Sequence, residues 1–211
     1  MSKKIVIFDL DGTLVDTIPA ICRSVNVVLK KHGYNTYDVE KFKDFIGKGF
    51  SVLFERINDI QKLELSKEIL VDEAIVEYNK DFLSGIYIYP NIDKLLSELE
   101  KRNIDIAIVT NKDHDLAVLH SKTILKDFNF KYVFGLKRNI SYKGKPDPYY
   151  LNEIAKEYDK KDMLFVGDMI VDINTAKNAN IDMIYLNHGY GEKNLAKISI
   201  DDPLEVLKYL G

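Results

Sequence analysis

The stretch that most constrains the fold is a short apolar run, Ile5–Phe8, which leads directly into two acidic residues, Asp9 and Asp11. A continuous run of β-branched and aromatic residues, without polar alternation, is typical of a strand buried on both faces. In open α/β sheets, the ligand site lies at the carboxyl ends of such strands. The run therefore predicts a parallel sheet that carries two carboxylates at its carboxyl edge.

The close spacing of these two acids suggests a chemical role. Asp9 and Asp11 are separated by one residue, and carboxylates this close repel each other unless a cation lies between them. Mg²⁺ bound by oxygen atoms is the simplest such cation. One carboxylate could then act as a nucleophile and the other as a proton donor or acceptor. The alternative is that both acids only cap a strand end and a turn.

Composition narrows the classes of function. The 211 residues are 46% apolar with a formal net charge of −3, which suits one large domain or a core with an insertion. This charge gives no indication of nucleic acid or an anionic membrane as a partner. A single cysteine, Cys22, excludes a disulfide framework, and no run reaches the length of a transmembrane helix. We expect a cytoplasmic protein that is a monomer or a homodimer.

Helical periodicity follows the first strand. After Asp16, apolar residues recur at helical spacing until Gly33. Three further helical segments are expected, near 39–45, 50–57 and 67–83. Because no strand pattern interrupts residues 17–84, this region is predicted to be an all-helical inserted domain.

The remainder of the chain alternates between strands and helices. Strands are predicted at 104–110, 132–135, 163–166 and 183–186, and helices near 92–101, 115–125, 149–158, 172–178 and 204–210. Such alternation with short apolar strands predicts a parallel sheet covered on both faces. The predicted fold class is therefore α/β, with a core formed by residues 1–16 and 85–211.

Four motifs resemble those of one known family. Asp-Leu-Asp-Gly-Thr-Leu-Val-Asp, at Asp9–Asp16, resembles motif I of the haloacid dehalogenase (HAD) superfamily phosphatases. Thr110–Lys112 resembles motif II, Lys145–Pro148 resembles motif III, and Gly167–Asp172 resembles motif IV. The motifs occur in the family's order and span nearly the whole chain. The resemblance implies a Rossmann-like core with a mobile helical cap domain inserted after motif I.

The same resemblance implies a reaction and roles for individual residues. It implies Mg²⁺-dependent hydrolysis of phosphomonoesters through an aspartyl-phosphate on Asp9, with Asp11 as the acid and then the base. Three residues would bind the phosphoryl group: Thr110, Asn111 and Lys145. The metal ligands would be Asp9, Asp168 and the backbone carbonyl of Asp11. Asp172 would support the metal shell or Lys145 through hydrogen bonds.

The sequence also departs from the family's pattern at two positions. Many relatives have Ser or Thr where this chain has Met169, and they often have Gly where Asn180 stands. Neither position carries the reaction, so we expect the class of activity to be unaffected.

Two segments bear on the substrate. Gly47, Lys48 and Gly49 resemble the cap loop of phosphoglycolate phosphatases, and glycines beside a lysine could bind a small anionic substrate. The alternative for these three residues is a flexible helix N-terminus. The segment 187–191 also resembles that subfamily's loop after the last strand. We therefore expect a small phosphorylated metabolite as substrate, with 2-phosphoglycolate a leading candidate.

Three other functions remain open. A β-phosphoglucomutase-like phosphomutase or a pyrophosphatase of the same superfamily would share the core motifs. From a different class, phospho-receiver signalling modules also use clustered aspartates with a threonine and a lysine. Receiver modules lack the Asp-x-Asp-Gly-Thr sequence and a helical insertion of this size, which disfavours them here.

Overall fold

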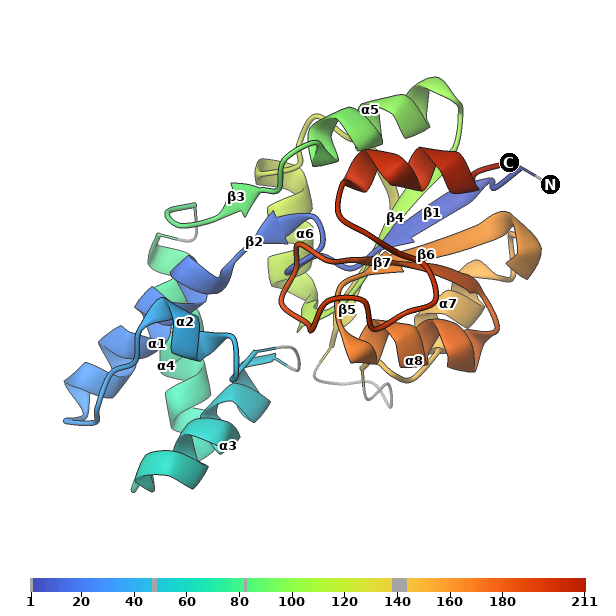
Figure 1. Cartoon of the computed structure of the whole chain (residues 1–211). Coiled ribbons are helices and arrows are strands. Elements are labelled where there is room, and N and C mark those ends of the chain that lie inside the picture. Colours follow the sequence, from blue (N-terminus) through green and yellow to red (C-terminus); the bar gives the residue numbers. More distant parts are fainter. Residues whose placement is uncertain (1, 47–48, 82, 138–143) are drawn as a thin grey trace. The chain divides into compact units, whose positions relative to one another are not determined.

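The computed structural model describes residues 2–46, 49–81, 83–137 and 144–211 of the chain (Figure 1). Clustering of contacts divides the chain into two compact units. The larger unit consists of Met1–Val15 with Ile88–Gly211, and the smaller unit is Asp16–Tyr87. Within the described residues, every helix is too short or too polar to cross a lipid bilayer.

The larger unit is built on a six-stranded parallel sheet with the order β5-β4-β1-β6-β7-β8. Its strands are β1 (Ile5–Phe8), β4 (Asp105–Asp113), β5 (Phe130–Leu136), β6 (Met163–Gly167), β7 (Asp182–Leu186) and β8 (Ser199–Ile200). The parallel α/β sheet predicted from the sequence is confirmed.

The strand β1 lies between β4 and β6 and is completely buried. Phe8 pairs with Ile108 on one side and Val166 on the other. Because all three strands run in the same direction, the residues that follow them leave the sheet at the same edge. This register brings the ends of β1, β4 and β6 together.

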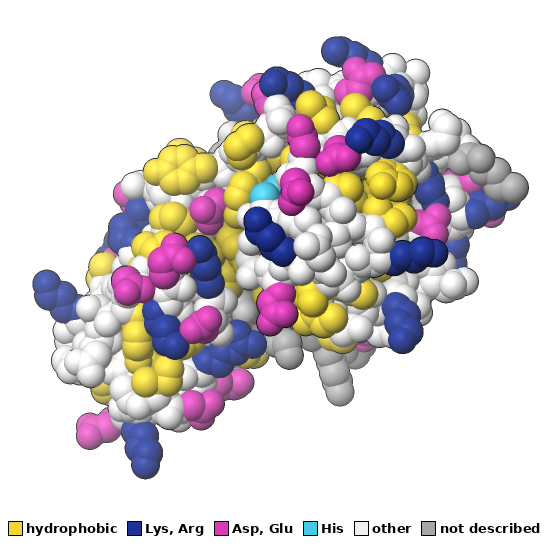
Figure 2. Space-filling model, in the orientation of Figure 1, with side chains coloured by type: hydrophobic (Ala, Val, Ile, Leu, Met, Phe, Trp, Pro, Cys, Tyr) yellow, Lys and Arg dark blue, Asp and Glu magenta, His cyan; other side chains and the backbone are white. Residues whose placement is uncertain are grey.

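Helices cover both faces of this sheet. Figure 1 shows α5 (Ile92–Lys101) and the 3₁₀ helix η2 (Pro203–Tyr209) on one face, and α7 (Tyr149–Ile154) and α8 (Ile170–Ala179) on the other. Ile5 and Ile7 pack with α7 and α8 in one hydrophobic cluster. The remaining helical elements of this unit are α6 (His114–Thr123) and the short η1 (Lys160–Asp162). On the face in Figure 2, acidic and basic side chains are interspersed.

The described residues of the smaller unit form four helices. They are α1 (Ile18–Lys31), α2 (Val39–Phe42), α3 (Gly49–Gln61) and α4 (Lys67–Lys80). The buried faces of α1, α3 and α4 supply most of its core, including Leu29, Phe54 and Tyr78. Ser66 accepts a hydrogen bond from the backbone N–H of Ile69 and so caps the first turn of α4. Two short strands, β2 (Val15–Asp16) and β3 (Tyr87–Ile88), form a separate two-stranded sheet.

Several predicted element bounds are wrong. The strand expected at 104–110 continues to Asp113, because the polar residues beyond Thr110 are buried by contacts with other parts of the chain. The helix expected at 149–158 ends at Ile154, and the closing helix is a 3₁₀ helix. The two-residue strands β2 and β8 are too short to produce a recognisable pattern in the sequence.

Candidate functional site

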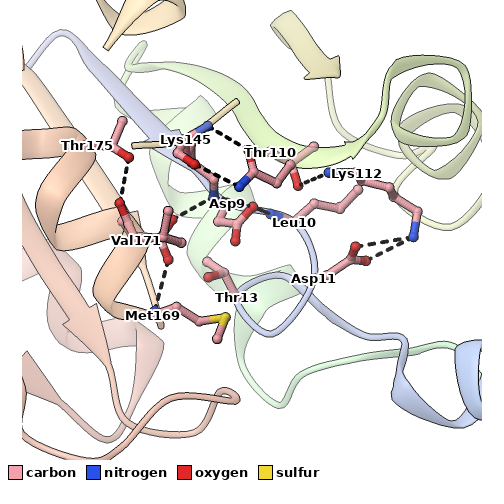
Figure 3. Close-up of polar contacts among 12 residues, drawn as sticks. Asp9, Leu10, Asp11, Thr13, Thr110, Lys112, Lys145, Met169, Val171 and Thr175 are labelled. Atoms are coloured by element: carbon pink, nitrogen blue, oxygen red, sulfur yellow. Dashed lines mark hydrogen bonds and ion pairs between the residues drawn. The ribbon is translucent and has the colours of Figure 1, made fainter. Parts of the chain in front are cut away.

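Asp9, the predicted nucleophile, lies directly after β1 and is only 6% exposed. Its Oδ1 accepts a hydrogen bond from the backbone N–H of Leu10 at 2.7 Å. The same oxygen lies 2.8 Å from Nζ of Lys145 (Figure 3). The other carboxylate oxygen, Oδ2, takes part in neither of these interactions. The backbone and Lys145 thus fix the orientation of a carboxylate at the carboxyl edge of the sheet.

Lys145 supplies the positive charge at this edge. Its side chain is 1% exposed, and Nζ lies 2.6 Å from Oδ1 of Asp172 as well as beside Asp9. Burial lowers the pKa of the Lys145 ammonium, but the nearby charges of Asp172 and Asp9 outweigh burial and raise it above its usual range. The lysine therefore stays protonated at neutral pH.

Asn111 holds Lys145 in place through the backbone. The side-chain carbonyl of Asn111 accepts a hydrogen bond from the Lys145 N–H at 2.7 Å, and the side-chain N–H of Asn111 donates to the Lys145 carbonyl at 3.1 Å. This pair of hydrogen bonds joins the end of β4 to the loop that carries the ammonium. Asn111 is thereby engaged with protein backbone, which adds a positioning role to the substrate contact predicted for it.

Asp168 and Asp172 lie at and after the end of β6. The Asp168 carboxylate accepts hydrogen bonds from Oγ1 of Thr13 at 2.6 Å and from the backbone N–H of Tyr190 at 2.7 Å. Oδ2 of Asp172 accepts from the backbone N–H groups of Asp168, at 3.1 Å, and Met169, at 2.9 Å. Asp172 therefore accepts the backbone N–H of Met169, the residue that precedes α8, as the third residue of a capping box does.

The other departure from the family's pattern also has a backbone explanation. Asn180 follows α8 in the left-handed conformation, with φ of 55°. Glycine adopts this conformation most easily, and asparagine is the next most common residue there. Asn180 thus ends the helix in the way that Gly commonly does.

Two loops pack closely against Asp168. A Cβ atom added to Gly12 would lie 2.3 Å from Oδ2 of Asp168, and one added to Gly189 would lie 2.2 Å from the Asp168 Cβ. Gly12 also has φ of +89°, which side chains rarely tolerate. The backbones of the loop after β1 and the loop after β7 therefore approach the Asp168 carboxylate too closely for a side chain to fit between them.

The acidic cluster fits a divalent cation. One carboxylate oxygen from each of Asp9, Asp168 and Asp172 lies within 4.8 Å of the others, close to the span of about 4.2 Å across an octahedral Mg²⁺ site. Burial, followed by the charges of Asp172 and Asp9, raises the pKa of Asp168 well above its usual range. The ammonium of Lys145 contacts Asp9 and Asp172, and a bound dication would offset the negative charge that Asp168 adds to the cluster. Both oxygens of Asp172 are engaged, Oδ1 with Lys145 and Oδ2 with two backbone N–H groups, whereas the contacts of Asp9 with Lys145 and Leu10 use Oδ1 alone. Asp9 is therefore a better candidate for a metal ligand than Asp172.

Asp11 and Thr110 make a second set of contacts at the same edge. Both carboxylate oxygens of Asp11 lie 3.2 Å from Nζ of Lys112, toward which the Asp11 side chain is turned (Figure 3). Oγ1 of Thr110 accepts a hydrogen bond from the Lys112 backbone N–H at 3.2 Å. Lys112 had no role in the sequence-based prediction, because a lysine after a strand usually points into solvent.

The predicted cap loop belongs to the smaller unit. Gly47 and Lys48 lie outside the described residues, and Gly49 is the first residue of α3 in the smaller unit. A role for these three residues in substrate binding stays a prediction.

The comparison with protein families decides the family. The model of the family described as "Haloacid dehalogenase-like hydrolase" matches residues 6–186, which is most of the chain. The chain belongs to this family. The HAD resemblance of the four motifs is thereby confirmed for the protein as a whole.

Individual relatives narrow the class within the HAD family. The chain is 31% identical over 202 residues to a phosphoglycolate phosphatase of Psychrobacter arcticus, covering 90% of this chain and 86% of that protein. It is 32% identical over 216 residues to a phosphoglycolate phosphatase of Pseudomonas syringae pv. tomato, covering 94% and 76% respectively. Family membership together with these relatives makes this HAD protein a phosphatase.

Solved structures of other proteins share the fold. A structure from Haemophilus somnus, named as a predicted phosphoglycolate phosphatase, matches with a TM-score of 0.88 and 26% identity, covering 100% of this chain and 99% of the other. CbbY from Rhodobacter sphaeroides, solved in complex with phosphate, matches with a TM-score of 0.81 at 20% identity, with 100% and 99% covered. The second likeness concerns the fold alone.

Proposed function

We propose that this HAD phosphatase is a Mg²⁺-dependent hydrolase of small phosphomonoesters, with 2-phosphoglycolate as the leading candidate substrate. The observation that carries the proposal is the pairing of Asp9 with Lys145 beside the buried Asp168. A phosphate monoester is negatively charged and must approach a carboxylate, so cations at this point are required. The names of the curated relatives support the choice of 2-phosphoglycolate.

In the proposed reaction, a carboxylate oxygen of Asp9 attacks phosphorus while the bond from phosphorus to the ester oxygen breaks. Asp11 donates a proton to the departing alcohol and then accepts one from the water that attacks the Asp9 phosphoester. Lys145 and the hydroxyl of Thr110 bind the phosphoryl oxygens. The φ of +89° at Gly12 permits the chain to turn directly after Asp11.

Asp9 and Asp168 would hold the metal ion, and the backbone carbonyl of Asp11 is its further proposed ligand. When bound, Mg²⁺ would neutralise phosphoryl charge and orient the group for in-line attack. Asp172 keeps Lys145 beside Asp9 and also orients the backbone of Asp168. Pairing with Lys145 and binding of Mg²⁺ would together offset the charges of the buried carboxylates in this cluster.

A phosphate-release screen over a panel of phosphomonoesters, with Mg²⁺ and with EDTA, tests the proposal. The panel includes 2-phosphoglycolate, sugar phosphates and pyrophosphate. We expect Mg²⁺-dependent release, fastest with 2-phosphoglycolate. Isomerisation of a sugar phosphate without phosphate release would identify a mutase, and preference for pyrophosphate would identify a pyrophosphatase. A flat profile across the panel would remove 2-phosphoglycolate as the substrate.

The role of Asp9 is tested with Asp9→Asn, which keeps the shape of the side chain and removes its charge and nucleophilicity. We expect turnover to be abolished while the variant stays folded. Asp182→Asn is a matched control, because Asp182 also pairs with a buried lysine, Lys3, but lies at the opposite edge of the sheet. Undiminished turnover by Asp9→Asn would show that another group attacks phosphorus.

A further inference from the structure

We propose that Lys112 is a positioning residue that holds the carboxylate of Asp11 in the orientation needed for proton transfer to the leaving group. This inference rests on the proposed function, in which Asp11 is the acid and base. Nζ of Lys112 lies 3.2 Å from each carboxylate oxygen of Asp11, so one ammonium contacts both oxygens. The pair joins the end of β4 to the loop after β1.

The environment of Lys112, near the end of the interior strand β4, is unusual for a lysine. Its side chain is only 5% exposed, whereas that of Asp11 is 22% exposed. Burying an ammonium is unfavourable unless it has a charged partner, so the location of Lys112 is explained by its contact with Asp11. The more exposed carboxylate is the member of the pair that can reach a substrate.

Fixing the Asp11 side chain has a chemical consequence. A free aspartate side chain samples several rotamers, and a general acid works only from those within hydrogen-bond reach of the leaving oxygen. The two contacts from Lys112 restrict the carboxylate plane as well as its direction. A carboxylate that is already oriented before the reaction lowers the barrier to proton transfer from Asp11 to the leaving oxygen.

Lys112 can be tested without disturbing its backbone hydrogen bond to Thr110. Its backbone N–H donates to Oγ1 of Thr110, and that hydrogen bond does not depend on the side chain. Lys112→Met keeps a long unbranched side chain for packing and removes only the ammonium. Asp11 stays partly exposed to water in this variant, so its charge can still be solvated.

The experiment measures kcat/KM for two phosphomonoesters that differ in their need for a general acid. An alkyl monoester such as 2-phosphoglycolate releases a poorly acidic alcohol, whereas p-nitrophenyl phosphate releases an acidic phenol that leaves without protonation. For Lys112→Met, we expect a loss of roughly tenfold to hundredfold on the alkyl ester and less than about threefold on the aryl ester, because general-acid assistance contributes about 10²–10⁴ to the rate. The ratio of the two values is independent of the fraction of folded protein.

Further variants connect the effect to Asp11. Asp11→Asn should show the same selective loss, and adding Lys112→Met to it should change the ratio little, because residues that act as a unit are not additive. Lys112→Arg keeps a cation able to contact both oxygens and should restore most of the ratio. Lys3→Met is the matched control: Lys3 is also buried and ion-paired, with Asp182, but lies at the other edge, so the ratio should not move.

The outcomes separate this inference from the proposed function. Equal losses on both esters for Lys112→Met, with a selective loss for Asp11→Asn, would overturn the positioning role and leave the proposed function intact. Such a result would mean that Lys112 acts on the phosphoryl group or on the fold. Equal losses on both esters for Asp11→Asn itself would instead overturn the acid role proposed for Asp11.

Discussion

Nζ of Lys145 lies 2.8 Å from Oδ1 of Asp9, although the two residues come from loops that follow different strands of the sheet. The contact places a permanent positive charge beside the carboxylate that we propose as nucleophile. A phosphate group approaching Asp9 would therefore meet a cation at the same point. Removal of either partner should affect catalysis and stability in different ways, and this difference can be measured.

Lys145→Met should abolish phosphate release and also destabilise the fold. The substitution leaves Asp9 and Asp172 buried without their shared cation, and breaking a buried ion pair in this way costs about 3–5 kcal/mol. Urea unfolding monitored by circular dichroism gives the free energy of unfolding. The double variant Lys145→Met with Asp9→Asn should recover part of the lost stability, because it removes one of the two uncompensated charges. No recovery would contradict the ion-pair explanation.

Mg²⁺ should raise the melting temperature of the wild-type protein. A ligand that binds only the folded state at about 100 times its Kd stabilises it by about 2.7 kcal/mol. Asp168→Asn removes a proposed ligand and should eliminate the shift, while EDTA should reverse it in the wild-type protein. Differential scanning fluorimetry in Mg²⁺ and in K⁺ of equal ionic strength measures the effect without any assay of turnover. An undiminished shift in Asp168→Asn would place the metal elsewhere.

Asn111→Ala should lower kcat without removing any charge from the site. The substitution deletes both hydrogen bonds to the Lys145 backbone and leaves buried backbone groups unpaired, at a cost of about 1–3 kcal/mol. The loop would then hold the ammonium less firmly beside Asp9. Steady-state kinetics should show a fall in kcat of about tenfold or more, because a small misplacement of a catalytic group costs a large factor in rate. A change in KM alone would mean that Asn111 contacts the substrate only.

The stability of the protein should fall at acidic pH in part because of His120. Burial, and then the charge of Lys112, lowers the pKa of His120 to about 2. The unfolded chain binds a proton on this histidine at higher pH than the folded protein does, so its stabilising contribution is complete above about pH 6.5 and is lost as the pH falls toward 2. At pH 4.5 the loss is roughly 2–3 kcal/mol, since one pH unit corresponds to about 1.4 kcal/mol.

His120→Leu tests this dependence. The variant has no proton to bind, so the free energy of unfolding of His120→Leu relative to the wild type should increase by roughly 2–3 kcal/mol between pH 7.5 and pH 4.5. Urea unfolding at the two pH values gives the comparison. A difference that does not change with pH would show that His120 does not titrate as its burial implies.

The strands and the acids that follow them could be predicted from local sequence. Asp9 and Asp168 each come after a run of apolar residues long enough for a buried strand, and both occupy the carboxyl edge of the sheet. The predicted ends of strands were less accurate where polar residues continue a strand, as Asn111 and Lys112 do in β4. Local patterns treat such residues as solvent-exposed, whereas here tertiary contacts bury them.

The sequence by itself determined the parallel α/β core, the helical insertion and the set of acids at the strand ends, because these depend on periodicity and on short motifs. Only the tertiary structure decided which cation meets which acid: Lys145 with Asp9 and Asp172, and Lys112 with Asp11. It also showed that the Tyr190 backbone binds Asp168. The physical reason is that burial and charge pairing arise between residues far apart in the chain, and no local pattern records them.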